Sequence, residues 1–167
     1  MTTIVKVGLP PIIDDQSECL ILGTLPGDES LRRKEYYGHP RNHFWPIMAE
    51  VINTQLSADY RQRCAQILQR RYAIWDVLQA AERTGSLDTA IRNARANDFA
   101  SLFLSYPKLR MIAFNGKGAQ ALYRRHIATR ADVPQDRVTT ITLPSTSPAY
   151  VLPLAEKIQA WKIAFDR

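Results

Sequence analysis

Four short apolar runs are separated by longer stretches in which apolar positions recur at helical spacing. The runs are rich in aliphatic and aromatic residues and stop at glycine, asparagine or proline, which is typical of buried strands followed by turns. We therefore predict strands within 18–27, 72–78, 109–116 and 137–148.

The stretches between these runs predict helices. From Phe44 onward, apolar residues recur at i+3, i+4 and i+7, which places them on one helix face. Pro46 has no N–H and fits only the first turn, so this helix begins near Asn42 or His43. Further helices are predicted within 59–71, 86–107, 117–130 and 154–165.

Strands that alternate with helices of this length indicate a parallel sheet covered on both faces. The expected fold class is α/β, a three-layer α/β/α sandwich with a four-stranded parallel sheet, in a single domain over 1–167. Right-handed crossovers put the carboxyl ends of the strands at one edge, where ligands bind in such folds. The loops "GTLPG", "NGKG" and "PSTSPAY" leave that edge, and we expect them to form one cleft walled by the aromatic segment before residue 46.

The composition narrows the possible partners only a little. The chain has 22 Lys and Arg residues against 16 Asp and Glu, a formal charge of +6, which suits a phosphate backbone without identifying one. Cys19 and Cys64 lie in an apolar run and in a helical stretch, so we expect ordinary buried or partly buried thiols. We expect no membrane association and a reducing, cytoplasmic location, because we find no secretory signal and no apolar run of about 18 residues.

Common cofactor and metal motifs do not fit. "GTLPG" lacks the GxGxxG pattern, and Gly118 follows Lys117 where a P-loop needs serine or threonine. His39 and His43 are four residues apart, but Pro40 lies between them and no clear third ligand follows, so we expect no metal site. Neither serine of the "PSTSP" loop lies in GxSxG, and two cysteines are too few for a four-thiolate cluster.

The chain resembles the uracil-DNA glycosylase superfamily, and most of all its DNA-deoxyinosine (hypoxanthine-DNA) glycosylase branch. The matching pieces occur in the family's order: "GTLPG" at 23–27, "YYGHPRNHFW" at 36–45, "WDVL" at 75–78, "GSLDTAI" at 85–91, "ND" at 97–98, "FNGKGA" at 114–119 and "LPSTSPAY" at 143–150. The resemblance implies a four-stranded parallel sheet between helices. It also implies a monomeric, monofunctional enzyme that flips hypoxanthine out of DNA containing deaminated bases and hydrolyses its N-glycosidic bond without metal or cofactor.

The resemblance places the catalytic role on the asparagine of "GHPRN", which is Asn42. Asparagine does not titrate, so its carbonyl would orient a water molecule instead of acting as a strong base. Asparagine is also a favoured helix cap, and the two roles are compatible. Leu25 stands where the superfamily often has a polar water-activating residue, which argues against strong uracil activity; we expect Leu25 and Gly23 to line the base pocket.

Three further residues are expected at the base, each with a structural alternative. Phe44 matches an aromatic that stacks on the extruded base in related enzymes, but it also fits the apolar face of its helix. Asn115 matches a base-contacting residue, and it would serve equally as the first residue of an Asn-Gly turn. Tyr37, with Tyr36, either lines the pocket or packs the loop.

The last loop matches the segment with which the superfamily grips phosphates beside the lesion. We expect DNA contacts from this loop and from the helix after "NG", at Pro144, Ser145, Thr146, Ser147, Tyr150 and Lys117. Tyr150 stands where sequences of the branch typically have asparagine. It either fills the gap left by the flipped base or packs on Val151 and Leu154.

Two rival functions remain open at this point. One is a uracil or mismatch-type DNA glycosylase of the same superfamily. The other is a non-catalytic α/β module that binds nucleic acid or a phosphorylated ligand. Three acidic residues, Asp76, Asp88 and Asp98, match motifs of the branch but would serve equally as helix caps or ion-pair partners.

Overall fold

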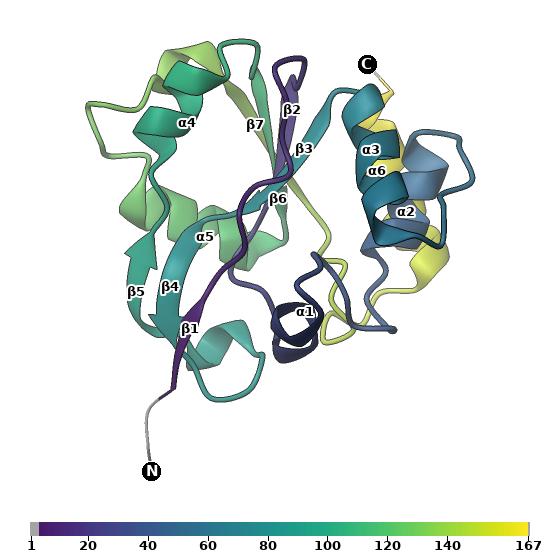
Figure 1. The fold of residues 1–167 in the computed structure, drawn as a ribbon, viewed down its shortest axis with the longest axis horizontal. Coiled ribbons are helices and arrows are strands. Elements are labelled where there is room, and N and C mark those ends of the chain that lie inside the picture. Colours follow the sequence, from purple (N-terminus) through teal and green to yellow (C-terminus); the bar gives the residue numbers. More distant parts are fainter. Residues whose placement is uncertain (1–3, 167) are drawn as a thin grey trace.

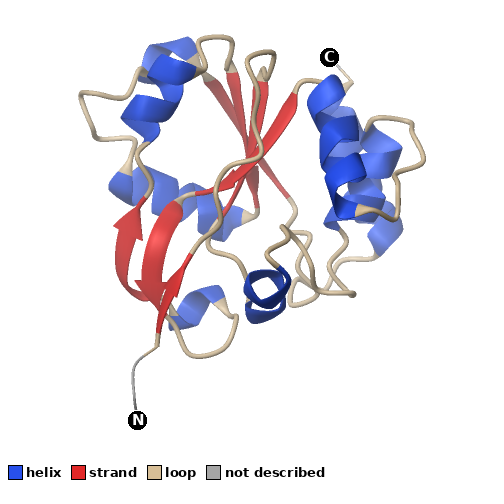
Figure 2. Cartoon of the chain, viewed as in Figure 1, coloured by secondary structure: helices blue, strands red, loops and turns tan. Residues whose placement is uncertain are grey.

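The computed structural model describes residues 4–166. Its centre is a four-stranded sheet in which all neighbouring strands run parallel (Figure 1, Figure 2). The strand order is β3-β2-β6-β7, with the bounds Tyr72–Asp76 (β3), Cys19–Gly23 (β2), Met111–Asn115 (β6) and Thr139–Leu143 (β7). Every residue of β2 is buried, as expected of a central parallel strand covered on both faces. The predicted sheet is confirmed.

Helices cover both faces of this sheet (Figure 1). One face carries α2 (Phe44–Val51), α3 (Tyr60–Gln69) and α6 (Leu154–Phe165), and the other carries α4 (Phe99–Ser105) and α5 (Lys117–His126). The predicted three-layer α/β/α arrangement is therefore confirmed. One short helix, α1 (Asp28–Arg33), follows the first loop and has no counterpart among the predicted elements.

Helix α2 begins where its proline requires. His43 is the N-cap residue, and Pro46 is the third residue of the helix, where an N–H would have no partner within the helix. Phe44, Ile47 and Met48 are buried on the inner side. The predicted start near Asn42 or His43 is confirmed.

A second, antiparallel sheet contradicts one of the predicted helices. It contains β1 (Val5–Val7), β4 (Leu78–Glu82) and β5 (Arg92–Ala96) in the order β1-β4-β5. The prediction of a mostly helical 86–107 is wrong for its first half, where a single 3₁₀ turn, η1 (Asp88–Ala90), precedes β5. Pairing with β4 outweighs the modest helix propensity of this stretch, and Asn93 has a φ of 50° that no helix contains.

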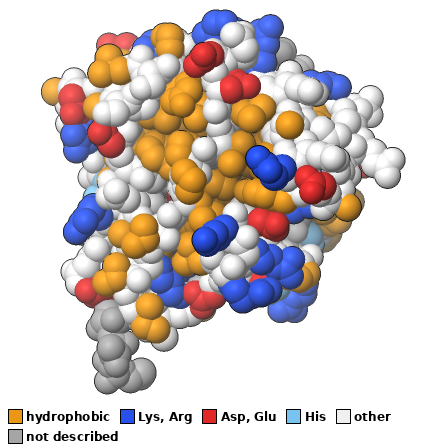
Figure 3. All heavy atoms as spheres, viewed as in Figure 1, with side chains coloured by type: hydrophobic (Ala, Val, Ile, Leu, Met, Phe, Trp, Pro, Cys, Tyr) orange, Lys and Arg blue, Asp and Glu red, His pale blue; other side chains and the backbone are white. Residues whose placement is uncertain are grey.

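The distribution of charged side chains on the surface does not by itself indicate the function of the protein. Figure 3 shows hydrophobic side chains gathered across the middle of one face, with Lys and Arg side chains mostly toward the rim. In the part of the chain that the structure covers, no helix combines the length and the apolar character needed to cross a bilayer. The site must therefore be located from its geometry.

Candidate active site

One cleft lies at the carboxyl edge of the parallel sheet, with a volume of about 550 Å³. That volume falls in the usual range of small-ligand pockets. The cleft is lined by the loop after β2, the aromatic segment before α2, the η1 turn, the ends of β3 and β6, and the last loop, at 23–30, Tyr36, Tyr37, His39, Asn42, Asp76, 86–89, Asn115 and 145–150. The predicted convergence on one cleft is confirmed for "GTLPG" and "PSTSPAY", whereas "NGKG" contributes only Asn115 to the lining.

Gly23, the last residue of β2, is at the floor of the cleft. A Cβ atom at this position would lie 2.5 Å from Oδ1 of Asp76 and 3.2 Å from the hydroxyl oxygen of Tyr37. No larger residue fits without moving one of these side chains. Leu25 is buried and also lines the cleft, so both residues predicted for the first wall lie there.

Asn42 lies at the cleft wall, just before α2. Its Oδ1 accepts a hydrogen bond from the backbone N–H of Phe44 at 2.9 Å, and its own N–H donates to the carbonyl of His39 at 2.9 Å. The side chain therefore satisfies one of the free N–H groups at the helix start from the position before the N-cap His43, through an Asx-turn bond to the residue two further on. A carbonyl oxygen has a second lone pair, so this bond leaves room for a water molecule.

Tyr37 lines the cleft, as do Tyr36 and Tyr150, whereas Phe44 does not. The Phe44 side chain is fully buried and packs edge-on against Trp45 and Trp161, with centroid distances of 5.0 and 6.2 Å. The ring of Tyr37 stacks on it at 4.0 Å, with an interplanar angle of 20°. Phe44 is thus too deep to meet a base in this conformation, and it supports the ring that lines the cleft. The backbone of Tyr37 adopts a left-handed φ of 55° to place its ring there.

Asn115 binds the last loop to the sheet. Its Oδ1 accepts from the N–H of Thr146 at 2.9 Å, and its Nδ2 donates to Oγ1 of Thr146 at 3.0 Å. The carbonyl of Thr146 in turn accepts from the N–H of His43 at 3.0 Å. With its side chain 1% exposed, Thr146 holds β6, the last loop and the start of α2 together. Its side chain is therefore placed to fix the loop.

The other residues predicted to contact DNA lie in two places. Ser145, Ser147 and Tyr150 line the cleft, and both serine oxygens accept backbone N–H groups within the loop at 3.2 Å. A serine hydroxyl that accepts such a bond still has its own hydrogen to donate. Pro144 lies outside the cleft lining, and its carbonyl accepts from Nε1 of Trp161 at 2.9 Å. The last predicted contact, Lys117, is the exposed first residue of α5 and is also outside the lining.

The buried carboxyl of Asp76 was not among the residues predicted for the site. Asp76 ends β3 at the cleft floor, is 5% exposed, and its Oδ2 has no hydrogen-bond partner among residues 4–166. Burial raises the pKa of Asp76 to about 7, the nearby negative charge of Asp88 adds to the rise, and Arg83 opposes it. An acidic residue at the last position of a buried strand, as in "WDVL", is the signal that points to it in the sequence.

Arg83 is a second residue that the sequence does not reveal. It follows β4 and is 1% exposed. Its guanidinium donates to the carbonyls of Leu25 at 3.4 Å and of Pro26, and its Nε donates to the carbonyl of Gly85 at 3.1 Å. The second sheet thus contributes an arginine that fixes the loop after β2 against the cleft.

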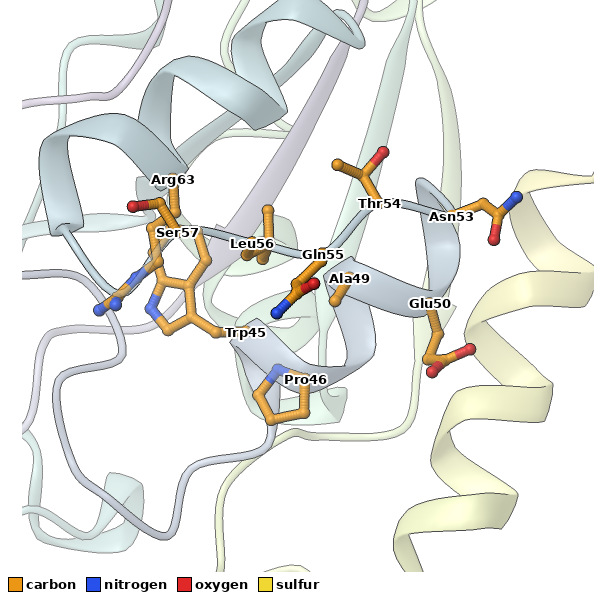
Figure 4. A pocket seen from close by; sticks show the side chains of 10 residues that line it. All are labelled: Trp45, Pro46, Ala49, Glu50, Asn53, Thr54, Gln55, Leu56, Ser57 and Arg63. Atoms are coloured by element: carbon orange, nitrogen blue, oxygen red, sulfur yellow. The ribbon is translucent and has the colours of Figure 1, made fainter.

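A separate pocket opens between α2 and α3, and its lining includes Trp45, Glu50 and Arg63 (Figure 4). The guanidinium of Arg63 lies 4.7 Å from the centroid of the Trp45 ring. None of the residues predicted for catalysis, base binding or DNA contact lines this pocket. The candidate active site is therefore the cleft at the sheet edge.

The family model of the uracil DNA glycosylase superfamily matches residues 10–165. The chain therefore belongs to the uracil DNA glycosylase superfamily. The match covers both the parallel sheet and every segment that lines the cleft.

Two similar proteins carry the name hypoxanthine DNA glycosylase. The one from Methanosarcina barkeri is 42% identical over 113 residues, which cover 67% of this chain and 72% of that protein. The one from Methanosarcina acetivorans is 41% identical over 116 residues, covering 69% and 73%. A solution NMR structure of a candidate uracil DNA glycosylase from Methanosarcina acetivorans is similar in fold, with a TM-score of 0.79 and 34% identity over 97% of each chain.

Proposed function

We propose that this protein is a DNA glycosylase that excises hypoxanthine from DNA containing deoxyinosine. The observation that carries the proposal is the identity of 42% and 41% to two hypoxanthine DNA glycosylases. The cleft supports it, because it gathers the motif residues Asn42, Tyr37 and Asn115 at one edge of the sheet. We further propose a monomeric protein with one domain over 1–167, active in the cytoplasm; the free, buried thiols of Cys19 and Cys64 suit a reducing compartment.

The reaction requires the target base to leave the duplex, since no active site reaches it inside the stack. Flipping costs a few kcal/mol and less for a mispaired base such as hypoxanthine. The ring of Tyr37 offers a stacking surface, and stacking on an aromatic side chain contributes about 1–3 kcal/mol per base. Ser145 and Ser147, with hydrogens free to donate, would hold the phosphates beside the flipped nucleotide.

Bond cleavage then proceeds toward an oxocarbenium-like sugar, as in other glycosidic cleavages. The electron pair of the C1′–N9 bond stays with the purine, and water adds to C1′. We propose that the carbonyl of Asn42 orients this water, using the lone pair not occupied by the N–H of Phe44. No lysine lines the cleft within residues 4–166, which favours a monofunctional enzyme over one that forms an imine with the sugar.

A panel of oligonucleotides tests the proposal. Single- and double-stranded substrates would contain hypoxanthine, uracil, xanthine or adenine at one position, with and without EDTA. We expect cleavage after alkali only at hypoxanthine, or most efficiently there, and no effect of EDTA. Efficient cleavage at uracil, with the inosine DNA left intact, would show that the protein is a uracil-type DNA glycosylase instead. A protein–DNA adduct trapped by borohydride would contradict the monofunctional mechanism.

A further inference from the structure

The floor of the cleft contains one carboxyl group that the mechanism above does not use. Three strand ends form this floor: Gly23 of β2, Asp76 of β3 and Asn115 of β6. Gly23 has no side chain, and Asn115 makes two hydrogen bonds to Thr146, which leave one Nδ2 hydrogen and one Oδ1 lone pair free. The carboxyl of Asp76 is buried, and its Oδ2 has no partner in the described part of the chain. Of the three strand ends, Asp76 alone therefore carries a titratable group, which can accept or donate a hydrogen bond according to its protonation.

The hydroxyl of Tyr37 lies beside this carboxyl. Its oxygen is also buried, and the Asn115 amide lies near it without a hydrogen bond of ordinary geometry. Both this oxygen and Oδ1 of Asp76 lie against the Cα of Gly23, at 3.2 and 2.5 Å from the position of a Cβ. Two unpaired polar groups in one buried place cost several kcal/mol unless water or a ligand pairs with them. At the floor of a cleft they suit a polar ligand that displaces water, which in the proposed function is the flipped base.

The charges around Asp76 favour its neutral form. Asp88 repels a second negative charge, and Tyr36 and Tyr37 are neutral phenols whose own pKa values burial raises. Arg83 is the one nearby cation among the described residues that lowers the pKa of Asp76, but its guanidinium bonds to backbone carbonyls, not to the carboxyl. The adjoining strand ends of β2 and β6 contribute no titratable group. Burial therefore raises the pKa of Asp76 by more than the positive charge of Arg83 lowers it.

We propose that Asp76 takes part in the reaction as a neutral carboxylic acid that donates a hydrogen bond to the purine as it departs. The inference rests on the proposed function. As the C1′–N9 bond breaks, its electron pair spreads over the purine nitrogens and O6. A neutral donor in a buried site stabilises this charge, by the same logic as an oxyanion hole, whereas a carboxylate would repel it. The proton stays on Asp76 throughout; water supplies the hydroxyl to C1′ and its remaining proton to the purine.

The proposal predicts a pH profile that a structural aspartate would not produce. Since the protonated form is the active one, single-turnover excision is constant below the pKa of Asp76. Above it, the rate falls by about tenfold per pH unit. Asp76→Asn keeps a donor of the same shape that does not titrate, so its rate stays level from pH 6 to 9. Asp76→Leu removes the donor and lowers the rate at pH 6 by about 10²- to 10³-fold.

The experiment compares the wild type, these two variants and a matched control. Asp98→Asn is the control, because Asp98 is an exposed N-cap of α4 outside the cleft and should keep the wild-type profile. The ratio of wild-type to Asp76→Asn rates cancels any ionisation of the substrate. A flat wild-type profile, an Asp76→Asn profile that falls like the wild type, or a full rate in Asp76→Leu would each overturn the role of Asp76. Each of those results is still compatible with hypoxanthine excision by the protein. A wild-type protein that releases no hypoxanthine would overturn both proposals.

Discussion

Replacing Asn42 by alanine separates its proposed catalytic role from its structural role, because the two roles predict effects of different kinds and sizes. The capping bond from the N–H of Phe44 to Oδ1, at 2.9 Å, is lost in Asn42→Ala. Loss of such a cap costs about 0.5–2 kcal/mol of stability. Loss of a group that positions the attacking water lowers the rate by a factor of about 10² or more.

The expected loss of stability is too small to account for a 100-fold loss of rate. A domain with about 5 kcal/mol of stability keeps about 3 kcal/mol after the largest capping loss, so more than 99% of the molecules stay folded. Partial unfolding therefore changes the excision rate by about 1% and never by 100-fold. A large loss of rate must come from the chemistry of the cleft.

The assay is single-turnover excision from an inosine duplex, with stability measured by denaturant unfolding. Asp59→Ala is the matched control, because Asp59 caps α3 by accepting from the N–H of Gln62 at 3.0 Å and lies outside the cleft. We expect both variants to lose similar stability and only Asn42→Ala to lose the rate. A folded Asn42→Ala protein with the wild-type rate would refute the catalytic role and leave Asn42 as a cap alone.

Three further changes test other parts of the cleft. Tyr150→Ala should weaken binding to duplex inosine DNA by about 1–3 kcal/mol and leave binding to single strands unchanged, since the half-exposed Tyr150 would fill the gap in the base stack. Equal losses of affinity for both substrates in a binding titration would indicate that Tyr150 packs within the protein instead. Thr146→Val leaves the Nδ2 of Asn115 without its acceptor, so the denaturant midpoint should fall by the equivalent of about 1–3 kcal/mol. An unchanged midpoint would show that the hydrogen bond between Asn115 and Thr146 does not stabilise the fold. The unfolding free energy of Asp76→Asn relative to wild type should rise between pH 4 and 7 by about 3 kcal/mol, because the pKa of Asp76 is raised from 3.8 to about 7 in the folded protein, which loses stability as pH rises through that window. A difference that is constant with pH would contradict the raised pKa.

The parallel sheet and the helices on its faces were predictable because their patterns are strong. Strand β2 is buried at every position, and Pro46 places the start of α2 within two residues. The convergence of loops follows from the topology, since parallel strands joined by right-handed crossovers end at one edge. Local pattern and tertiary structure agree at these positions.

The second sheet was not predictable in the same way. The sequence of β5, "RNARA", contains no apolar alternation and takes its strand form from pairing with β4. Its consequence for function is the position of Arg83, whose contacts to Leu25 and Pro26 join segments almost sixty residues apart in sequence. Such long-range contacts leave no periodic signal.

The sequence predicted which residues lie near the cleft better than it predicted how deeply each side chain is buried. Asn42 and Asn115 lie at the cleft as predicted, but periodicity gives no means to tell that Phe44 lies beneath Tyr37 or that Thr146 is buried. The side-chain depth of neighbouring residues in a loop depends on backbone angles such as the left-handed φ of 55° at Tyr37.

Identification of the released product gives the sharpest test of hypoxanthine excision. The purified protein would be incubated with a duplex containing a single deoxyinosine, and the small-molecule fraction separated by chromatography and mass spectrometry. We expect free hypoxanthine in an amount equal to the abasic sites formed, with the strand uncut before alkali. Release of inosine or its nucleotide, or an intact duplex with enzyme in excess, would rule out hypoxanthine excision.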